Sequence, residues 1–199
     1  MTANHYYLVV DYCNNGDLET WVKNQIRLSQ PEAIYFLKQI MIGFKTLHKN
    51  KIMHRDFKLA NIFLNNDTII IGDFGFAKQV LKETGSILGT PEIMAPEILI
   101  SYRDRMDIKY TNKVDLWSIG ICFYEMLFGK KPWDPKSIQE LLEKQKNNSG
   151  DNLEFSSDAK ISILCKDLLR GLLKFDPKQR IEWDQFFKHR VFGSHIASN

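Results

Sequence analysis

The sequence predicts an α+β fold that is mainly helical, with one strand near the N-terminus and one small β-hairpin. Two helical signals dominate: a capping box at Ser29 followed by apolar residues at helical spacing, and an apolar run from Leu116 to Phe128. The hairpin is predicted where two β-branched segments flank a polar loop, over residues 61–71. Of the 199 residues, 44% are hydrophobic and 26% charged, which fits one well-filled globular unit.

The N-terminal third contains a predicted strand, a short helix and a long helix. Residues 5–13 are aromatic and β-branched without a turn residue, and Asn14-Asn15-Gly16 ends the strand because these residues accept positive φ. Asp17 then begins the short helix. The capping box at residues 29–32, with Pro31 in the first turn, starts the long helix, whose predicted apolar face comprises Ile34, Leu37, Met41, Phe44 and His48.

The rest of the chain alternates loops and helices. Residues 61–64 and 68–71 form the predicted hairpin, and residues 76–97 lose hydrophobic periodicity, as expected of a surface segment. Ser101 to Tyr110 is charged and predicted to be a solvated loop, and the alternative is a segment that contacts a substrate or regulator. Helices are predicted over residues 112–128, 137–146 and 158–173, an exposed loop over 147–152, and a closing segment over 181–189.

Composition excludes several classes of partner and compartment. The formal net charge is only +3, so we expect neither nucleic-acid binding nor a membrane-surface site. The three cysteines, Cys13, Cys122 and Cys165, lack metal-ligand spacing, and two of them lie in apolar helical runs. We therefore expect buried thiols in a reducing cytosol or nucleus, and of these two locations we predict the cytoplasm. No secretory leader opens the sequence, and the longest apolar run is too short to span a bilayer.

Four ordered motifs carry the chemical signal. They are His54-Arg55-Asp56-Phe57-Lys58-Leu59-Ala60-Asn61, then Asp73-Phe74-Gly75, then Gly89-Thr90-Pro91 with Ala95-Pro96-Glu97, and finally Asp115-Leu116-Trp117-Ser118-Ile119-Gly120. A lone Asp-Phe-Gly would indicate only a strand end and a turn, whereas four motifs in order are specific. The set resembles the eukaryotic protein kinase family, serine/threonine type, over nearly the whole chain. Residues 72–78 and 180–187 most resemble its autophagy-initiating subgroup.

The resemblance implies a phosphoryl-transfer site that uses ATP and Mg²⁺. By family analogy Asp56 orients and deprotonates the protein hydroxyl, and Lys58 steadies the γ-phosphate. Asn61 and Asp73 would hold Mg²⁺, because Mg²⁺ needs oxygen ligands. Phe57 and Leu59 stand where the family usually has Leu and Pro, and neither change removes a chemical group.

The family pattern also implies an adenosine site. It places backbone groups of Asp11 and Cys13 against the adenine, Asp17 against the ribose and Phe63 under the base. Two of these positions have simpler interpretations. Asp17 is also explained as an acid at a helix start, and Phe63 by packing in the core.

Regulatory and structural roles follow from the same resemblance. Arg55 matches a phosphate-pairing cation, Ser86 a phosphorylation site and Thr90 the residue that touches the catalytic Asp. An unmodified surface serine explains Ser86 nearly as well. Two structural contacts are implied as well: an ion pair between Glu97 and Arg180, and an acid, Asp115, that holds the catalytic loop.

The 199 residues contain no Gly-rich loop and no strand lysine paired to a helix glutamate, which form the small lobe of a complete kinase. We therefore expect a truncated kinase domain over residues 1–192, made of a hinge strand at 5–13 plus the large lobe, and a tail at 193–199. It could be a fragment, a mispredicted gene product or a protein reduced to this lobe. The alternative function is a non-catalytic module that binds a regulator, a substrate or a complete kinase, and a small-molecule kinase is a weaker third choice.

Overall fold

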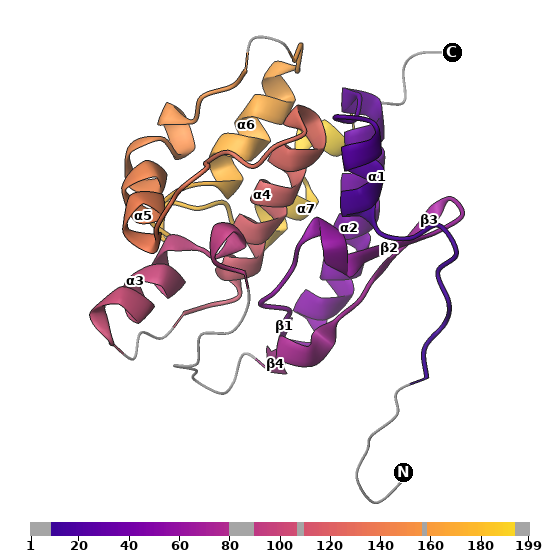
Figure 1. The fold of residues 1–199 in the computed structure, drawn as a ribbon, viewed down its shortest axis with the longest axis horizontal. Helices are drawn as coiled ribbons and strands as arrows, with labels where there is room; N and C mark the ends of the chain where they lie inside the picture. The colour runs from indigo at the N-terminus through magenta and orange to yellow at the C-terminus, as the bar shows by residue number, and fades with distance from the viewer. Residues whose placement is uncertain (1–8, 80–89, 107–109, 157–158, 194–199) are drawn as a thin grey trace, which may run out of the picture.

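A computed structural model of the chain describes residues 9–79, 90–106, 110–156 and 159–193. Helices α2, Gln30–Lys49, and α4, Lys113–Phe128, pack against each other in the middle of the molecule. The hairpin lies beside α1 and α2, while α3 and α5 stand together on the opposite side of α4 (Figure 1). The predicted α+β class, mainly helical with a small antiparallel hairpin, is confirmed.

The predicted strand over residues 5–13 is not present in its described part. Residues 9–13 have no regular structure, and the side chains of Val9 and Tyr12 are 93% and 86% exposed. The strand pattern alone is insufficient because a strand needs a hydrogen-bonded neighbour, and none of the described strands pairs with this segment. Pairing begins only at the turn, where the Asn15 N–H donates to the Leu64 carbonyl over 3.2 Å and the Leu64 N–H donates to the Gly16 carbonyl over 2.8 Å.

Helices α1, Leu18–Asn24, and α2 begin where the sequence predicts. Asp17 caps α1, and the capping box at Ser29 is present: the Ser29 N–H donates to Glu32 Oε2 over 2.9 Å. The buried face of α2 comprises Ala33, Ile34, Leu37, Ile40 and Phe44. Met41 and His48, predicted on this face, are only half-buried.

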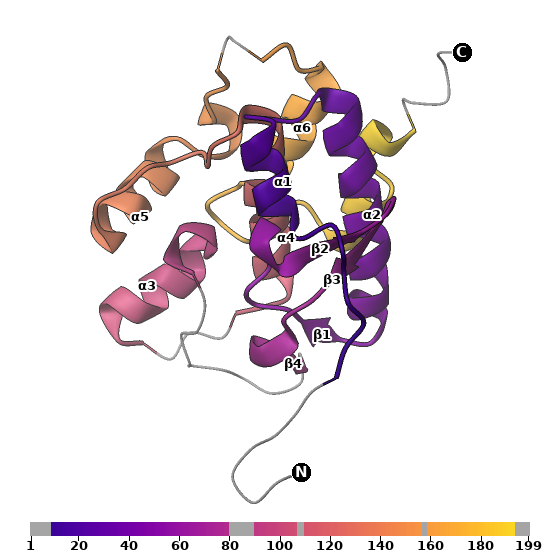
Figure 2. The ribbon, with the colours of Figure 1, turned by 45° about the vertical axis from the view of Figure 1, so that its right-hand side comes forward.

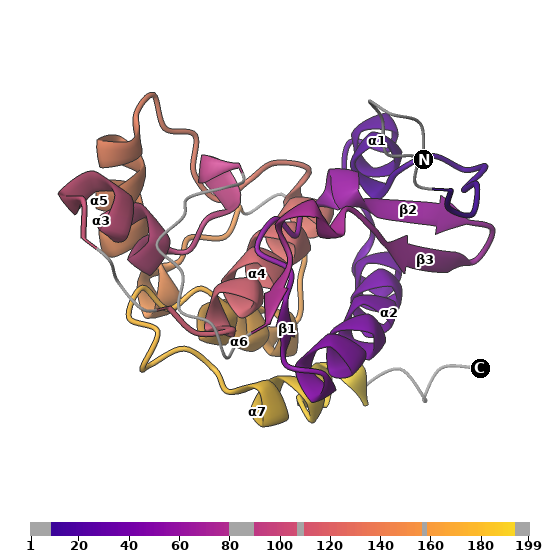
Figure 3. The same cartoon turned by 90° about the horizontal axis from the view of Figure 1, so that it is seen from below.

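Two antiparallel strand pairs flank the motif at residues 54–61. The predicted hairpin consists of β2, Ile62–Asn65, and β3, Thr68–Ile71, with Ile62 opposite Ile71. A second pair joins β1, Ile52–Met53, to β4, Lys78–Gln79. The sequence analysis missed this pair because two-residue strands carry no periodic signal. Figure 3 shows the hairpin projecting beside α1 and α2.

The helices after residue 90 differ from prediction at three places. Residues 101–104 belong to helix α3, Pro96–Asp104, although a loop was predicted. Helix α6 begins at Ile163, not at residue 158, because the Ser162 hydroxyl accepts from the Cys165 N–H and caps it there. The segment predicted as an exposed loop at 147–152 contains the buried Ser149 and Gly150. The helices of this region are α3, α4, α5 Ile138–Asn147, α6 Ile163–Leu172 and α7 Trp183–Phe187.

Helix α4 organises the core. All its residues are buried except Lys113 and Glu125, which are half-buried, and an all-round apolar helix belongs in the centre of a domain. Figure 2 shows α4 between the hairpin and the pair of α3 and α5. Among the described residues, none of the helices combines the length and apolarity that crossing a membrane requires. Cys122 on α4 and Cys165 on α6 are buried, as predicted, and burial raises the pKa of both thiols.

Candidate active site

The backbone at the start of the loop over residues 54–61 is hydrogen-bonded to Asp115, which lies in the first turn of α4. Its Oδ2 accepts from the His54 N–H over 2.9 Å and its Oδ1 from the Arg55 N–H over 3.0 Å. Burial raises the pKa of the Asp115 carboxyl, although the two backbone N–H groups oppose that shift. Arg55 adopts a left-handed backbone conformation, φ 69°, so the two bonds fix a strained turn.

Four predicted site residues form one contact group above this turn. Lys58 Nζ donates to Asp56 Oδ2 and to Thr90 Oγ1, both over 2.9 Å. The Thr90 N–H donates to Asp56 Oδ1 over 3.2 Å, and Asn61 Nδ2 donates to the Asp56 carbonyl over 2.9 Å. Asp56 is only 2% exposed, so its carboxylate is fixed between a cation and a backbone donor.

Asp73 follows β3, and the residue before it, Gly72, is hydrogen-bonded to the loop at residues 54–61. The Gly72 N–H donates to the Asn61 carbonyl over 2.9 Å, and His54 Nε2 donates to the Gly72 carbonyl over 3.0 Å. A Cβ at residue 72 would lie 2.5 Å from the Phe63 ring, so any larger residue there would force this ring to move. Asp73 is left-handed, φ 57°, and its exposed carboxylate accepts from the Gly75 N–H.

The donor set at Asn61 and Asp73 fits Mg²⁺. The side-chain nitrogen of Asn61 donates to the Asp56 carbonyl, its side-chain oxygen is a possible metal ligand, and Asp73 adds a carboxylate. Hard oxygen donors of this kind suit Mg²⁺, which usually takes one or two protein ligands and completes its shell with water and substrate phosphates. In the described part of the chain, no cluster of three or more His, Cys, Asp or Glu could hold a metal ion.

The residues expected around adenosine are only partly brought together. Asp17 and Phe63 form a β-bridge, so they are neighbours, and Phe63 is half-buried. Both carboxylate oxygens of Asp17 already accept from Thr20, from its N–H over 2.8 Å and its hydroxyl over 3.0 Å. Asp11 is exposed and Cys13 half-buried, and both lie on the irregular segment that precedes the turn at Asn15.

The Arg55 side chain contacts two groups that the sequence analysis did not single out. Its Nε donates to the Phe76 carbonyl over 2.6 Å, and its Nη1 donates to the Tyr110 hydroxyl over 3.2 Å. No local pattern could identify Tyr110, because the two residues are 55 positions apart in the sequence. Ser86 lies outside the described residues, so its predicted relation to Arg55 stays a prediction.

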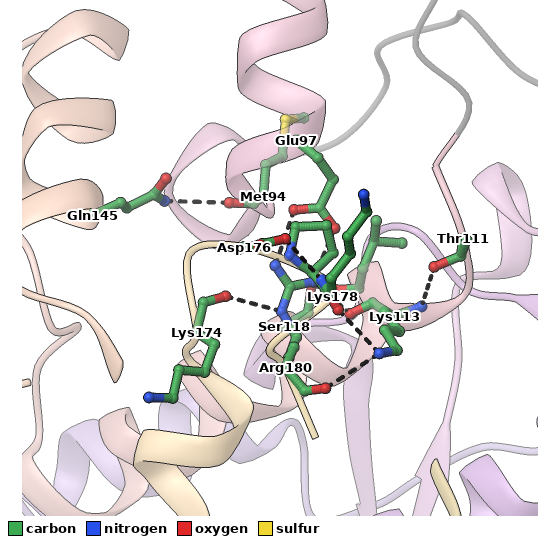
Figure 4. A network of polar contacts seen from close by, with 12 residues as sticks. Met94, Glu97, Thr111, Lys113, Ser118, Gln145, Lys174, Asp176, Lys178 and Arg180 are labelled. Atoms are coloured by element: carbon green, nitrogen blue, oxygen red, sulfur yellow. Dashed lines mark hydrogen bonds and ion pairs between the residues drawn. The ribbon is translucent and has the colours of Figure 1, made fainter. Parts of the chain in front are cut away.

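The predicted ion pair between Glu97 and Arg180 is present in the form of two parallel bonds. Nη1 contacts Oε1 and Nη2 contacts Oε2, each over 2.9 Å, with side-chain exposures of 0% for Arg180 and 11% for Glu97. Arg180 also donates to the carbonyls of Lys113 and Lys174 (Figure 4). The pair joins the first turn of α3 to the C-terminal segment.

The profile of the protein kinase domain matches residues 1–192. The chain belongs to the protein kinase family. Its relatives include the serine/threonine-protein kinase atg1 of Dictyostelium discoideum, 37% identical over 92% of this kinase chain and 27% of the relative. Serine/threonine-protein kinase ULK3 of Xenopus laevis is 36% identical, and the match covers 94% of the chain and 39% of the relative. Serine/threonine-protein kinase ULK1 of Homo sapiens is also 36% identical, and the match covers 94% of the chain and 18% of the relative.

These relatives give the kinase chain its place within the family. All three are named serine/threonine-protein kinases, and their names confirm the expected similarity to the autophagy-initiating subgroup. The kinase chain spans 18–39% of the length of these relatives. Its helical architecture with the small hairpin is the large lobe of a protein kinase.

Proposed function

We propose that this chain is the large lobe of a serine/threonine protein kinase, which transfers the γ-phosphoryl group of ATP to a serine or threonine hydroxyl of a protein. One observation carries the proposal: Asp56, Lys58 and Thr90 are in mutual contact, beside Asn61 and the strand end that bears Asp73. Phosphoryl transfer is catalysed mainly by positioning and electrostatics, and this group supplies a fixed carboxylate and a fixed cation.

In the mechanism that we propose, Asp56 orients the attacking hydroxyl and takes its proton. The carboxylate is buried and bonded on both oxygens, so it can hold one geometry while the acceptor arrives. Lys58 lies between Asp56 and Thr90, where its ammonium group would contact oxygen atoms of the transferred phosphoryl group. Thr90 fixes both partners, since its N–H reaches Asp56 and its hydroxyl accepts from Lys58.

ATP and Mg²⁺ would bind along the opening of this site. Asn61 and Asp73 would hold the metal, which when bound neutralises charge on the phosphates. On the adenosine side, the backbone at Asp11 and Cys13 would meet the base, with Phe63 beneath it. Asp17 would have to share acceptor lone pairs with Thr20 to reach the ribose, so its helix-capping role is the better supported one.

The proposal is tested in a two-lobe protein, made by joining this chain to the small lobe of a relative. Asp56→Asn should lower the rate of peptide phosphorylation at least about 10³-fold, since it removes the proton acceptor and its charge. The matched control is Asp67→Asn, at the exposed tip of the hairpin, which should leave the rate unchanged. Turnover in the Asp56→Asn protein close to that of the control, with equal Tm values, would refute the assignment.

We further propose that the 199 residues alone bind ATP weakly and have little kinase activity. Val9, Val10 and Tyr12 are 93%, 71% and 86% exposed. This segment would therefore contact the adenine base from one side and leave its other side in water. Phe74 is 45% exposed beside the metal-binding strand end. Removal of a single preorganised donor commonly costs about 10²–10³ in rate, and a whole lobe provides several. Calorimetry with Mg-ATP should give no saturable binding below millimolar concentration, and micromolar affinity with turnover would contradict the proposal.

A second candidate function is a non-catalytic module that binds substrates of complete kinases. The exposed apolar side chains of the N-terminal segment favour it, because surfaces of this kind indicate contact with another polypeptide. The test adds the chain carrying Asp73→Ala to a phosphorylation assay of a complete ULK-type kinase. A fall in phosphorylation that excess substrate reverses would support the module, and an unchanged rate at tenfold molar excess of chain over substrate would count against it.

The remaining expectations follow the family. The chemical partners that we propose are ATP and a protein substrate, and the predicted cytoplasmic location rests on the buried thiols Cys122 and Cys165. The domain bounds that we propose are 1–192 for the truncated kinase domain and 193–199 for the tail.

A further inference from the structure

Arg55 is held by three contacts from two segments that lie far from it in the sequence. Its N–H donates to Asp115 on α4, its Nε to the carbonyl of Phe76 and its Nη1 to the hydroxyl of Tyr110. Tyr110 and Asp115 belong to the same stretch of chain, the lead into α4 and its first turn. This stretch therefore controls both the backbone and the side chain of Arg55.

Among the described residues, none of the hydrogen bonds that the Arg55 side chain donates goes to a carboxylate. Its Nε and Nη1 donate to neutral oxygens, the Phe76 carbonyl and the Tyr110 hydroxyl, while the Asp115 carboxylate accepts from the Arg55 backbone N–H and attracts the guanidinium only through space. A guanidinium has five N–H donors, and the donors on Nη2 are used by neither contact. A half-buried cation of this kind favours an anion at the position of its neutral partner.

Tyr110 carries the group at which such an anion can be formed. Its hydroxyl oxygen is 3.2 Å from Arg55 Nη1, its side chain is half-buried, and it precedes α4 in backbone without regular structure. Attachment of a phosphoryl group to that oxygen would bring about −1.5 to −2 charges and three acceptor oxygens within reach of Nη1 and Nη2.

We propose that Tyr110 is a phosphorylation site whose phosphate pairs with Arg55. A tyrosine-directed kinase acting in trans, with a nucleoside triphosphate, carries out the modification. The phenolic oxygen forms a bond to the γ-phosphorus, the bond from this phosphorus to the β–γ bridging oxygen breaks, the nucleoside diphosphate leaves, and the phenolic proton passes to the base of that kinase. The phosphate then connects the lead into α4 with Arg55 and, through it, with the Phe76 carbonyl.

This inference goes beyond the proposed function and does not depend on it, because its test requires no catalysis by the chain. The chain is produced with genetically encoded phosphotyrosine at position 110, with and without Arg55→Gln. The matched control places the phosphotyrosine at position 102, on the exposed part of α3, where the native tyrosine is 51% exposed. Two quantities are measured: the Tm by scanning calorimetry, and the second pKa of the phosphate by ³¹P NMR.

We expect the phosphate at position 110 to raise the Tm by about 3–8 °C, as one or two charge-assisted hydrogen bonds should in a chain of this size. Its pKa should lie about 1 unit below that of the phosphate at position 102, because a cation favours the dianion. Arg55→Gln should remove both effects. The proposal is overturned by an unchanged or lower Tm, by a Tm gain that survives Arg55→Gln, by equal phosphate pKa values at the two positions, or by failure of the modified chain to fold.

Discussion

Replacing Glu97 by glutamine tests how far the fold depends on its buried ion pair. The pair makes two parallel bonds of 2.9 Å, and Arg180 is fully buried while Glu97 is 11% exposed (Figure 4). Water therefore cannot replace the lost carboxylate, and the glutamine NH₂ group would face a guanidinium that also donates. Two charge-assisted bonds at about 1.5–3 kcal/mol each agree with the 3–5 kcal/mol usual for breaking one partner of a buried pair.

We expect Glu97→Gln to lower the free energy of unfolding by about 3–5 kcal/mol, measured by urea denaturation of the chain and followed by tryptophan fluorescence. The matched control is Glu19→Gln, which breaks the exposed i,i+4 pair with Lys23 and should cost at most about 0.5 kcal/mol. A double variant, Glu97→Leu with Arg180→Met, should recover part of the loss because no uncompensated charge remains. Equal losses in Glu97→Gln and Glu19→Gln would refute the argument.

Three further substitutions test local features of the fold. Gly129→Ala should lower the free energy of unfolding, measured by urea titration, by about 2–5 kcal/mol. The reason is that Gly129 has φ +70° and a Cβ there would lie 1.8 Å from the Ile26 carbonyl oxygen. A loss below about 1 kcal/mol would contradict this geometry. Ser29→Ala should cost about 1 kcal/mol by removal of the α2 capping box, and no change in the urea midpoint would show that the cap is dispensable. Burial raises the pKa of Glu125, so its carboxyl binds more protons in the folded state, and its contribution to stability falls as pH rises through that raised pKa. Glu125→Gln should therefore raise the Tm at neutral pH but not at about pH 3, well below the unfolded-state pKa, where the carboxyl is protonated in both states. An equal Tm change at both pH values would rule this out.

The catalytic motifs and the helices with strong local signals could be predicted from the sequence. The capping box at Ser29 is a contact between residues three positions apart, so the sequence contains all of it. The hairpin over residues 62–71 is likewise local, because its two strands are joined by a two-residue turn. Asp56, Lys58 and Asn61 are within five residues of one another, and one short loop brings them together.

The tertiary structure decided what depends on distant partners. Residues 9–13 have a strong strand pattern but no strand, because hydrogen bonds to a neighbouring strand make a strand, and no described segment provides them. The pairing of β1 with β4 leaves no trace in a two-residue pattern, and residues 101–104 are helical although their charges predicted a loop. Helix α3 is stabilised by packing against α5, and this tertiary contact cannot be inferred from the charges of residues 101–104.

The same reason explains which site contacts the sequence could not reveal. Thr90 reaches Asp56 across 34 residues, and the family resemblance anticipated that contact. Tyr110 reaches Arg55 across 55 residues and belongs to no motif, so only the folded chain places its hydroxyl on the guanidinium. Contacts between side chains that the packing of α4 brings together depend on where this helix lies in the fold. No short stretch of sequence specifies that position.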